Sequence, residues 1–200
     1  MNPPPIPTYP ARPINGGPLD VALAKHGDWR YEPKYNGWRA LVHIATGAMF
    51  NRHGQRLTIE GEFKPALEQL RGTLDAEAFQ WADCEALERR HNIGRGSLIV
   101  LDVIPEASHR AAAYLERRRW LEAVLEMPTL SVPPEDNQVA LVPSDYASDA
   151  LWMFTRRANV TLGCAFYEGV VAKRADKPYP IQLLSAGREF PFWMKHRWTF

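Results

Sequence analysis

The sequence predicts an α+β domain made mainly of antiparallel sheet with flanking helices. Strand-like segments outnumber helical ones, and several of them follow one another in pairs joined by short turns. Such pairs are typical of antiparallel sheet, whereas consecutive parallel strands need a long crossover, which is usually a helix. The chain has 200 residues, of which 46% are hydrophobic, so it can bury a core in one domain.

The N-terminal residues 1–19 are predicted to form a proline-rich arm, distinct from a domain over residues 20–200. Seven of the 17 prolines lie in the first 18 residues, and proline lacks the amide hydrogen that helices and sheets require. We therefore expect an arm that is extended on the surface or disordered. Neither a signal peptide nor an apolar run of membrane-spanning length is found, so a cytoplasmic protein without a membrane contact is expected.

A hairpin and a short helix are predicted at the start of the domain. Two strand-like runs flank Thr46 within residues 38–54, which indicates a hairpin that turns at Thr46-Gly47. In the next segment, residues 61–70, Leu67 and Leu70 lie on one side of a predicted helix.

The rest of the domain alternates between strands and helices. The predicted strands are residues 78–87, 97–104, 137–146, 166–174 and 191–198. Residues 97–104 are apolar enough to form a buried central strand. A second helix is predicted over residues 148–159.

Helical periodicity also extends from His109 to Met127. The predicted buried face holds Tyr114, Leu121, Val124 and Leu125. The predicted solvent face holds Glu116, Arg117 and Glu122, and the run Arg117–Arg119 is typical of a solvated surface.

Composition narrows the function only slightly. The net charge of +1 provides no overall field for a polyanion, so contact with a nucleic acid would depend on local clusters of arginine and lysine. The two cysteines, Cys84 and Cys164, lack the spacing of a zinc site, so we expect reduced thiols, with Cys84 as a small buried residue.

Two pairs of like charges fall at alternate positions in predicted strands. Lys195 and Arg197 project from one face of their strand, as do Asp83 and Glu85 from theirs. Like charges are costly to bury side by side unless a ligand or an opposite charge lies between them. A phosphate would satisfy the cations, and a metal ion or a ribose hydroxyl would satisfy the acids.

Five short motifs occur in a definite order along the chain: KYNGWR at 34–39, NRHG at 51–54, DCE at 83–85, EGVVAK at 168–173 and WMKHR at 193–197. In types and order they resemble the nucleotidyltransferase domain shared by ATP-dependent DNA ligases, RNA ligases and mRNA capping enzymes. The resemblance covers roughly residues 30–198. It implies the ligase nucleotidyltransferase fold, which is ATP-grasp-like.

The resemblance also implies roles for single residues, with ATP and Mg²⁺ as cofactors. The implied catalytic residues are Lys34, Lys195 and Arg197, of which Lys34 is the nucleophile that becomes a lysyl-AMP. The implied nucleotide contacts are Glu32 near the adenine, Arg52 and Glu85 near the ribose, Lys173 near the phosphates, and Arg39 and Glu168. The implied magnesium ligands are Glu168 and Glu85.

Some of these residues also fit a purely structural role. Arg52 suits a solvated hairpin corner, Lys173 a solvated strand end, and Glu85 an ion pair with Arg89 or Arg90. Trp193 is predicted to pack in the core.

Three features depart from the family pattern. Asn36 stands where aspartate is usual, and Leu101 stands where the family often has an aromatic residue against the base. No C-terminal OB-fold domain is expected from the sequence. Two explanations remain open: an OB-fold module is supplied as a separate partner, or the protein works without one.

The resemblance favours a DNA ligase adenylation domain, a monomer that acts on nicked double-stranded DNA in repair, replication or recombination. An RNA ligase or a capping-type guanylyltransferase is the nearest alternative. A nucleotide-binding or nucleic-acid-binding module without turnover is the alternative from another class.

Overall fold

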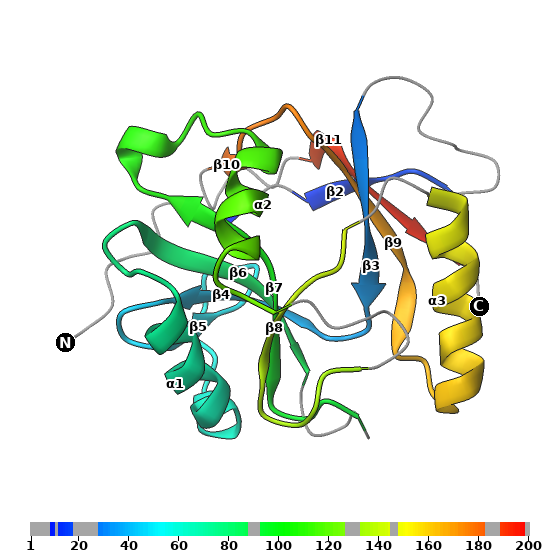
Figure 1. Ribbon diagram of the computed structural model, residues 1–200, viewed down its shortest axis with the longest axis horizontal. Coiled ribbons are helices and arrows are strands. Elements are labelled where there is room, and N and C mark those ends of the chain that lie inside the picture. Colours follow the sequence, from blue (N-terminus) through cyan, green and yellow to red (C-terminus); the bar gives the residue numbers. More distant parts are fainter. Residues whose placement is uncertain are drawn as a thin grey trace.

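The computed structural model describes residues 9–10, 12–17, 28–87, 93–126, 133–144, 148–182 and 189–198. Two sheets, flanked by helices, form the body of the molecule, and strands that are distant in sequence lie side by side (Figure 1). Most strand pairs are antiparallel. The predicted α+β class is therefore confirmed.

The four-stranded sheet has the order β2-β11-β9-β3. Its strands are β2 (Arg12–Asn15), β11 (Glu189–Arg197), β9 (Tyr167–Arg174) and β3 (Trp29–Tyr35). Strand β2 runs parallel to β11, and the other two pairs are antiparallel. The helix α3 (Ser148–Leu162) packs on β3 and β9, where its Leu151 and Trp152 meet Val170 and Ala172.

The five-stranded sheet has the order β5-β4-β6-β7-β8. Its strands are β4 (Trp38–His43), β5 (Ala48–Phe50), β6 (Phe79–Leu87), β7 (Ser97–Pro105) and β8 (Val139–Leu141). The hairpin predicted around Thr46 is β4-β5. A 3₁₀ turn, η1 (Glu60–Phe63), leads into α1 (Lys64–Thr73), whose Leu67 and Leu70 are buried in the largest apolar cluster, as predicted.

The helix predicted over residues 109–127 is shorter than expected. A 3₁₀ turn, η2 (Ala107–His109), precedes α2 (Tyr114–Glu122). The predicted solvent position of Arg117 is wrong, because its side chain is fully buried against Asp102 of the neighbouring β7. Arg118 is also buried, and Val124, predicted to be buried, is 48% exposed. The run of three arginines is therefore not a solvated face.

Part of the proline-rich segment forms β-strands that pair with strands from the rest of the chain. Arg12–Asn15 forms β2, and β1 (Tyr9–Pro10) pairs with β10 (Ile181–Gln182). The rest of the predicted arm lies largely outside the described residues, as do Arg89 and Arg90.

No helix within the described part of the chain is long and apolar enough to span a membrane. Both cysteines are free thiols, and Cys84 is buried as predicted.

A smaller apolar cluster joins the two sheets. It comprises Leu41 and Trp81 from β4 and β6, Ile104 from β7, Trp193 from β11, and Tyr179. Trp193 is 2% exposed, which confirms its predicted place in the core. The sheets therefore meet through side chains of their facing surfaces.

Candidate active site between the two sheets

The bend at Asn36-Gly37 carries the chain from one sheet to the other. Lys34 is near the end of β3, and β4 begins at Trp38 in the five-stranded sheet. The Asn36 side-chain amide donates to the carbonyl of Ala165 at 2.9 Å, a bond that a carboxylate could not make. Asn36 therefore secures the bend to the segment before β9.

Gly37 allows the bend to pass close to β6. A Cβ atom at this position would lie 2.8 Å from the Ala86 carbonyl oxygen and 2.8 Å from Cγ of Glu85. The Gly37 amide donates to Oε1 of Glu85 at 3.0 Å. The Lys-x-Asn-Gly spacing thus brings Lys34 to Glu85, although the two residues belong to different sheets.

The register of the four-stranded sheet aligns several predicted site residues. Lys34 of β3 and Arg197 of β11 both pair with Gly169 of β9, one on each side of it. Glu32 of β3 and Lys195 of β11 pair with Val171 of β9 in the same way. Directly opposed residues of an antiparallel sheet project from the same face. Lys34, Arg197 and Lys195 therefore share one face, as the alternation in WMKHR predicts for its two cations.

Glu168 reaches this face through a β-bulge. The pairing of β3 with β9 passes from Lys34–Gly169 to Tyr35–Tyr167, so Glu168 is the extra residue. A bulge redirects the side chain of the residue that it inserts. Lys34 Nζ donates to Oε2 of Glu168 at 2.5 Å, and Arg197 Nη2 lies 3.1 Å from the same oxygen.

Gly169 makes the bulge sterically possible. Its φ of +147° is rare for residues with a side chain, and an added Cβ would lie 1.9 Å from the backbone oxygen of His196. The glycine of the EGVVAK motif is therefore required by the strand β11 that passes beside it.

We expect Gly169→Ala to lower the free energy of unfolding by roughly 1–3 kcal/mol, because the alanine must strain the backbone or push β11 away. Chemical denaturation measures this change. Gly72→Ala is the matched control, because nothing lies within 4 Å of its added Cβ and the site is helical. Equal stability of the two variants would contradict this account of the bulge.

Glu85 is the second carboxylate near Lys34. Burial raises the pKa of Glu85 to about 7, although Lys34, Arg39 and the Gly37 amide oppose the rise. The nearby carboxylate of Glu168 adds to the increase. Glu85 can therefore gain or lose a proton near neutral pH.

Glu168 and Glu85 fit a magnesium ion that is also bound by phosphate oxygens. Mg²⁺ is commonly held by one or two carboxylates, with substrate phosphates and waters completing its shell. Within the described ranges, no group of three or more His, Cys, Asp or Glu residues could hold a metal ion. Two carboxylates next to Lys34 suit a metal that arrives with a nucleotide.

Arg39 is held in place by Asp83. Its Nε and Nη2 donate to the two Asp83 oxygens at 2.9 and 2.6 Å. The guanidinium also lies 5.5 Å from the ring centre of Trp193. Asp83 is fully buried, and its sequence context predicts only that it shares a strand face with Glu85.

Lys173 and Glu32 form a buried ion pair. Lys173 Nζ lies 2.9 Å from Oε2 of Glu32, and both side chains are 2% exposed. Tyr114 donates to the other Glu32 oxygen at 2.6 Å, and Lys173 donates to the carbonyl of Leu101 at 2.9 Å. The alternative of Lys173 as a solvated strand end is therefore wrong. Glu32 and Lys173, assigned to opposite ends of the nucleotide, are direct neighbours here.

Tyr114 is a site residue that the sequence does not predict, because helical periodicity indicates only that it lies on a buried face. Its ring lies 5.2 Å from the Lys173 ammonium, and Trp193 lies 4.6 Å from the same nitrogen. An ammonium group between aromatic rings is stabilised by the negative face of each ring.

Arg52 stands apart from this group. It is exposed in the turn after β5, and its Nε donates to the ring of His53 at 3.1 Å.

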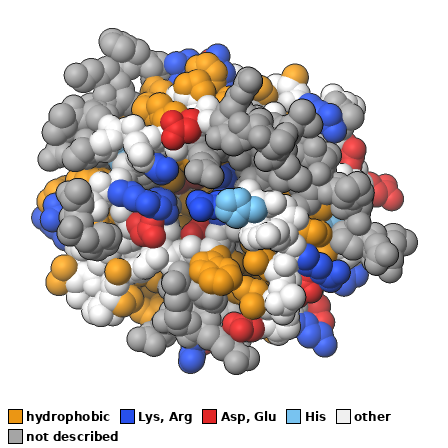
Figure 2. All heavy atoms as spheres, turned by 180° about the vertical axis from the view of Figure 1, so that it is seen from behind, with side chains coloured by type: hydrophobic (Ala, Val, Ile, Leu, Met, Phe, Trp, Pro, Cys, Tyr) orange, Lys and Arg blue, Asp and Glu red, His pale blue; other side chains and the backbone are white. Residues whose placement is uncertain are grey.

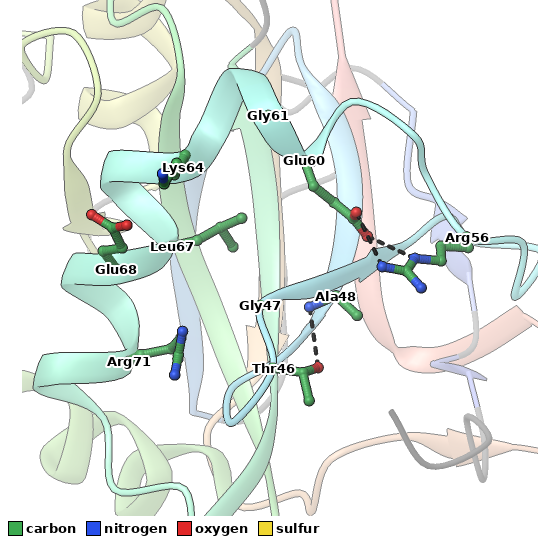
Figure 3. Close-up of a pocket in the computed structure, with 10 residues that line it drawn as sticks. All are labelled: Thr46, Gly47, Ala48, Arg56, Glu60, Gly61, Lys64, Leu67, Glu68 and Arg71. Carbon is green, nitrogen blue, oxygen red and sulfur yellow. Dashed lines mark hydrogen bonds and ion pairs between the residues drawn. The ribbon is translucent and has the colours of Figure 1, made fainter. Parts of the chain in front are cut away.

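A separate pocket of about 300 Å³ lies between the β4-β5 turn and α1 (Figure 3). It is lined by Thr46, Gly47, Ala48, Arg56, Glu60, Gly61, Lys64, Leu67, Glu68 and Arg71. Because none of these is a predicted site residue, the pocket is distinct from the candidate active site.

Comparisons with known proteins find a relative by sequence and several similar folds. The "Multifunctional non-homologous end joining DNA repair protein LigD" of Mycobacterium tuberculosis is 27% identical over 190 residues, which cover 88% of this chain and 22% of that protein. The chain thus spans less than a quarter of the length of this relative. No protein-family model matches the chain.

Two solved structures have a similar fold. A mycobacterial DNA ligase D complexed with ATP and MES matches with a TM-score of 0.60 and 23% identity, over 95% of this chain and 60% of that one. The ligase domain of M. tuberculosis LigD matches with a TM-score of 0.58 and 22% identity, over 95% and 59% of the two chains.

Proposed function

We propose that this chain, which has the nucleotidyltransferase fold of the LigD ligase domain, is the adenylation domain of an ATP-dependent DNA ligase. One observation carries the proposal: Lys34 Nζ and Arg197 Nη2 converge on a single oxygen of Glu168 beside Glu85. A lysine with both acidic and basic neighbours is suited to covalent catalysis at a phosphate.

In the first step Lys34 Nζ, in its neutral form, attacks the α-phosphorus of ATP. A nitrogen–phosphorus bond forms, the bond to pyrophosphate breaks, and AMP remains on Lys34 as a phosphoramidate. Glu168 Oε2 accepts the Nζ hydrogen bond, so it holds the amine in place and can receive its proton. The phosphoramidate intermediate divides the transfer of AMP from ATP to DNA into two easier displacements.

Positive charge near the phosphate is supplied by Arg197, Lys195 and Arg39. Cations that are fixed before the reaction stabilise charge that develops on phosphate oxygens. A magnesium ion bound through Glu168 and Glu85 would add to this stabilisation.

The remaining predicted contacts are proposed for other parts of the nucleotide. Glu32 is proposed for the adenine, and Arg52 and Glu85 for the ribose. A role of Lys173 at the phosphates requires its ammonium to exchange the Glu32 carboxylate for a phosphate oxygen.

The proposed substrate is nicked double-stranded DNA. AMP passes from Lys34 to the 5′-phosphate at the nick, and the 3′-hydroxyl then displaces AMP and seals the strand. Figure 2 shows Lys and Arg side chains, together with acidic ones, around a hollow in the rear face of the molecule. Because the net charge is only +1, local cations of this kind would have to hold the DNA backbone.

Intact-protein mass spectrometry tests the proposal. After incubation with ATP and Mg²⁺, we expect an AMP-sized increase in mass that is lost when labelled protein is mixed with nicked DNA. GTP and nicked RNA duplexes are the comparison substrates. Labelling by GTP alone would indicate a capping-type enzyme, and ATP binding without a mass increase would indicate a binding module.

A further inference from the structure

Tyr179 is a buried neighbour of the ion pair between Arg39 and Asp83. It is 3% exposed, and its hydroxyl donates to Oδ2 of Asp83 at 2.8 Å. The same oxygen accepts Nη2 of Arg39 at 2.6 Å, while Oδ1 accepts its Nε. Among the hydrogen bonds of the described residues, the Asp83 carboxylate accepts three. Two come from Arg39 and one comes from the Tyr179 hydroxyl.

The ring of Tyr179 is fixed by residues from both sides of the interface between the sheets. It meets Trp193 of β11 edge-on, with ring centres 5.7 Å apart and an interplanar angle of 90°. The Arg117 guanidinium of α2 lies 5.6 Å from its centre. The hydroxyl is thus directed at Asp83 by a ring that has little freedom to turn.

A fully buried carboxylate needs several donors to hold one orientation. Without the Tyr179 hydroxyl, Asp83 would keep only the two bonds from Arg39, and the two side chains could turn together. Arg39 would then lose the orientation that directs it to the layer between the sheets, where it also influences Glu85.

We infer that Tyr179 is a positioning residue for AMP transfer, because its hydrogen bond to Asp83 fixes the carboxylate that orients Arg39. The inference rests on the proposed function, in which Arg39 stabilises charge on the phosphate. Tyr179 itself contacts neither the nucleotide nor Lys34 in this account.

The first test is Tyr179→Phe, which removes the hydroxyl and keeps the ring. We expect the single-turnover rate of lysyl-AMP formation to fall about tenfold, as for a lost hydrogen bond to a charged group. The KM for ATP should change less than about twofold, since the effect lies in orientation during the chemical step. Tyr167→Phe is the control, because it removes the hydroxyl of another buried tyrosine, one that is hydrogen-bonded with Tyr35 and not with Asp83.

A double-mutant cycle separates positioning from a general loss of structure. If Tyr179 acts through Arg39, then adding Tyr179→Phe to Arg39→Gln should reduce the rate by less than about twofold. A further tenfold reduction in the Arg39→Gln background would overturn the inference.

A measurement without turnover keeps this inference separate from the proposed function. In ¹⁵N-detected NMR, the Arg39 Nε–H should be protected from exchange in the parent and should exchange at least several times faster in Tyr179→Phe. An unchanged exchange rate would refute the positioning role even if AMP transfer occurs. A parent protein that forms no lysyl-AMP would refute the proposed function, and the exchange rate would still decide the role of Tyr179.

Discussion

Lys34→Arg should abolish the covalent attachment of AMP while leaving the protein folded. Arginine keeps a positive charge that can pair with Glu168, but its guanidinium stays protonated and cannot act as a nucleophile. The loss should therefore be complete rather than partial, and intact-protein mass after incubation with ATP and Mg²⁺ measures it. Thermal unfolding should show a midpoint close to that of the parent.

Lys64→Arg provides the matched control for Lys34→Arg. Lys64 is exposed at the start of α1, so its replacement should leave labelling intact. Peptide mapping of the labelled parent should place AMP on the peptide that contains Lys34. AMP found on Lys173 or Lys195, or retained by Lys34→Arg, would show that the nucleophile was misassigned.

Arg117→Met should give the largest loss of stability among the variants considered. Arg117 and Asp102 are joined by two bonds of 2.8 Å, and both side chains are at most 1% exposed. Burial raises the Asp102 pKa, but the Arg117 guanidinium outweighs that effect and holds the pKa below its usual value. Removing Arg117 leaves a buried, unpaired carboxylate, which costs about 3–5 kcal/mol in the free energy of unfolding.

The pH dependence of Arg117→Met has a defined sign. Without Arg117, burial is opposed only by the weaker effects of Lys173 and the Val103 amide, so the folded-state pKa of Asp102 should exceed its unfolded-state pKa. The folded state then binds more protons, and the penalty should shrink as the pH falls from 7 towards about 5. Urea unfolding at several pH values measures this trend.

Two further variants isolate the buried pair. Arg119→Met changes an exposed arginine two positions along α2 and should alter stability by less than about 0.5 kcal/mol. Combining Arg117→Met with Asp102→Leu removes both charges and should recover most of the loss. A double variant as unstable as the single one would show that packing, not the unpaired charge, explains the effect.

The parts of the fold that depend on local pattern were predictable from the sequence. The hairpin at Thr46, the face of α1 with Leu67 and Leu70, and the buried strand β7 follow from apolar periodicity and turn residues. The shared face of Lys195 and Arg197 likewise follows from alternation along one strand. These features need no information about distant residues.

Other features could not be predicted because they depend on distant partners. Arg117 has the sequence context of a solvated arginine, and only its position above Asp102 makes burial possible. The direction of Glu168 depends on a bulge that no alternation pattern reveals. Tyr179 and Asp83 form their bond across 96 positions of sequence, so neither neighbourhood indicates it.

The placement of Lys34 at the end of β3 also has a consequence for the order of folding. The partner of Lys34, Glu168, is 134 positions away, and β3 pairs only with β9 among the described strands. Contacts of such long sequence separation form late, because a long loop must close before they are gained. On the ribosome, the proposed nucleophile Lys34 therefore emerges well before Glu168, its partner. If the proposed function holds, a nascent chain should not react with ATP until the strand that carries Glu168 has been synthesised and has paired with β3.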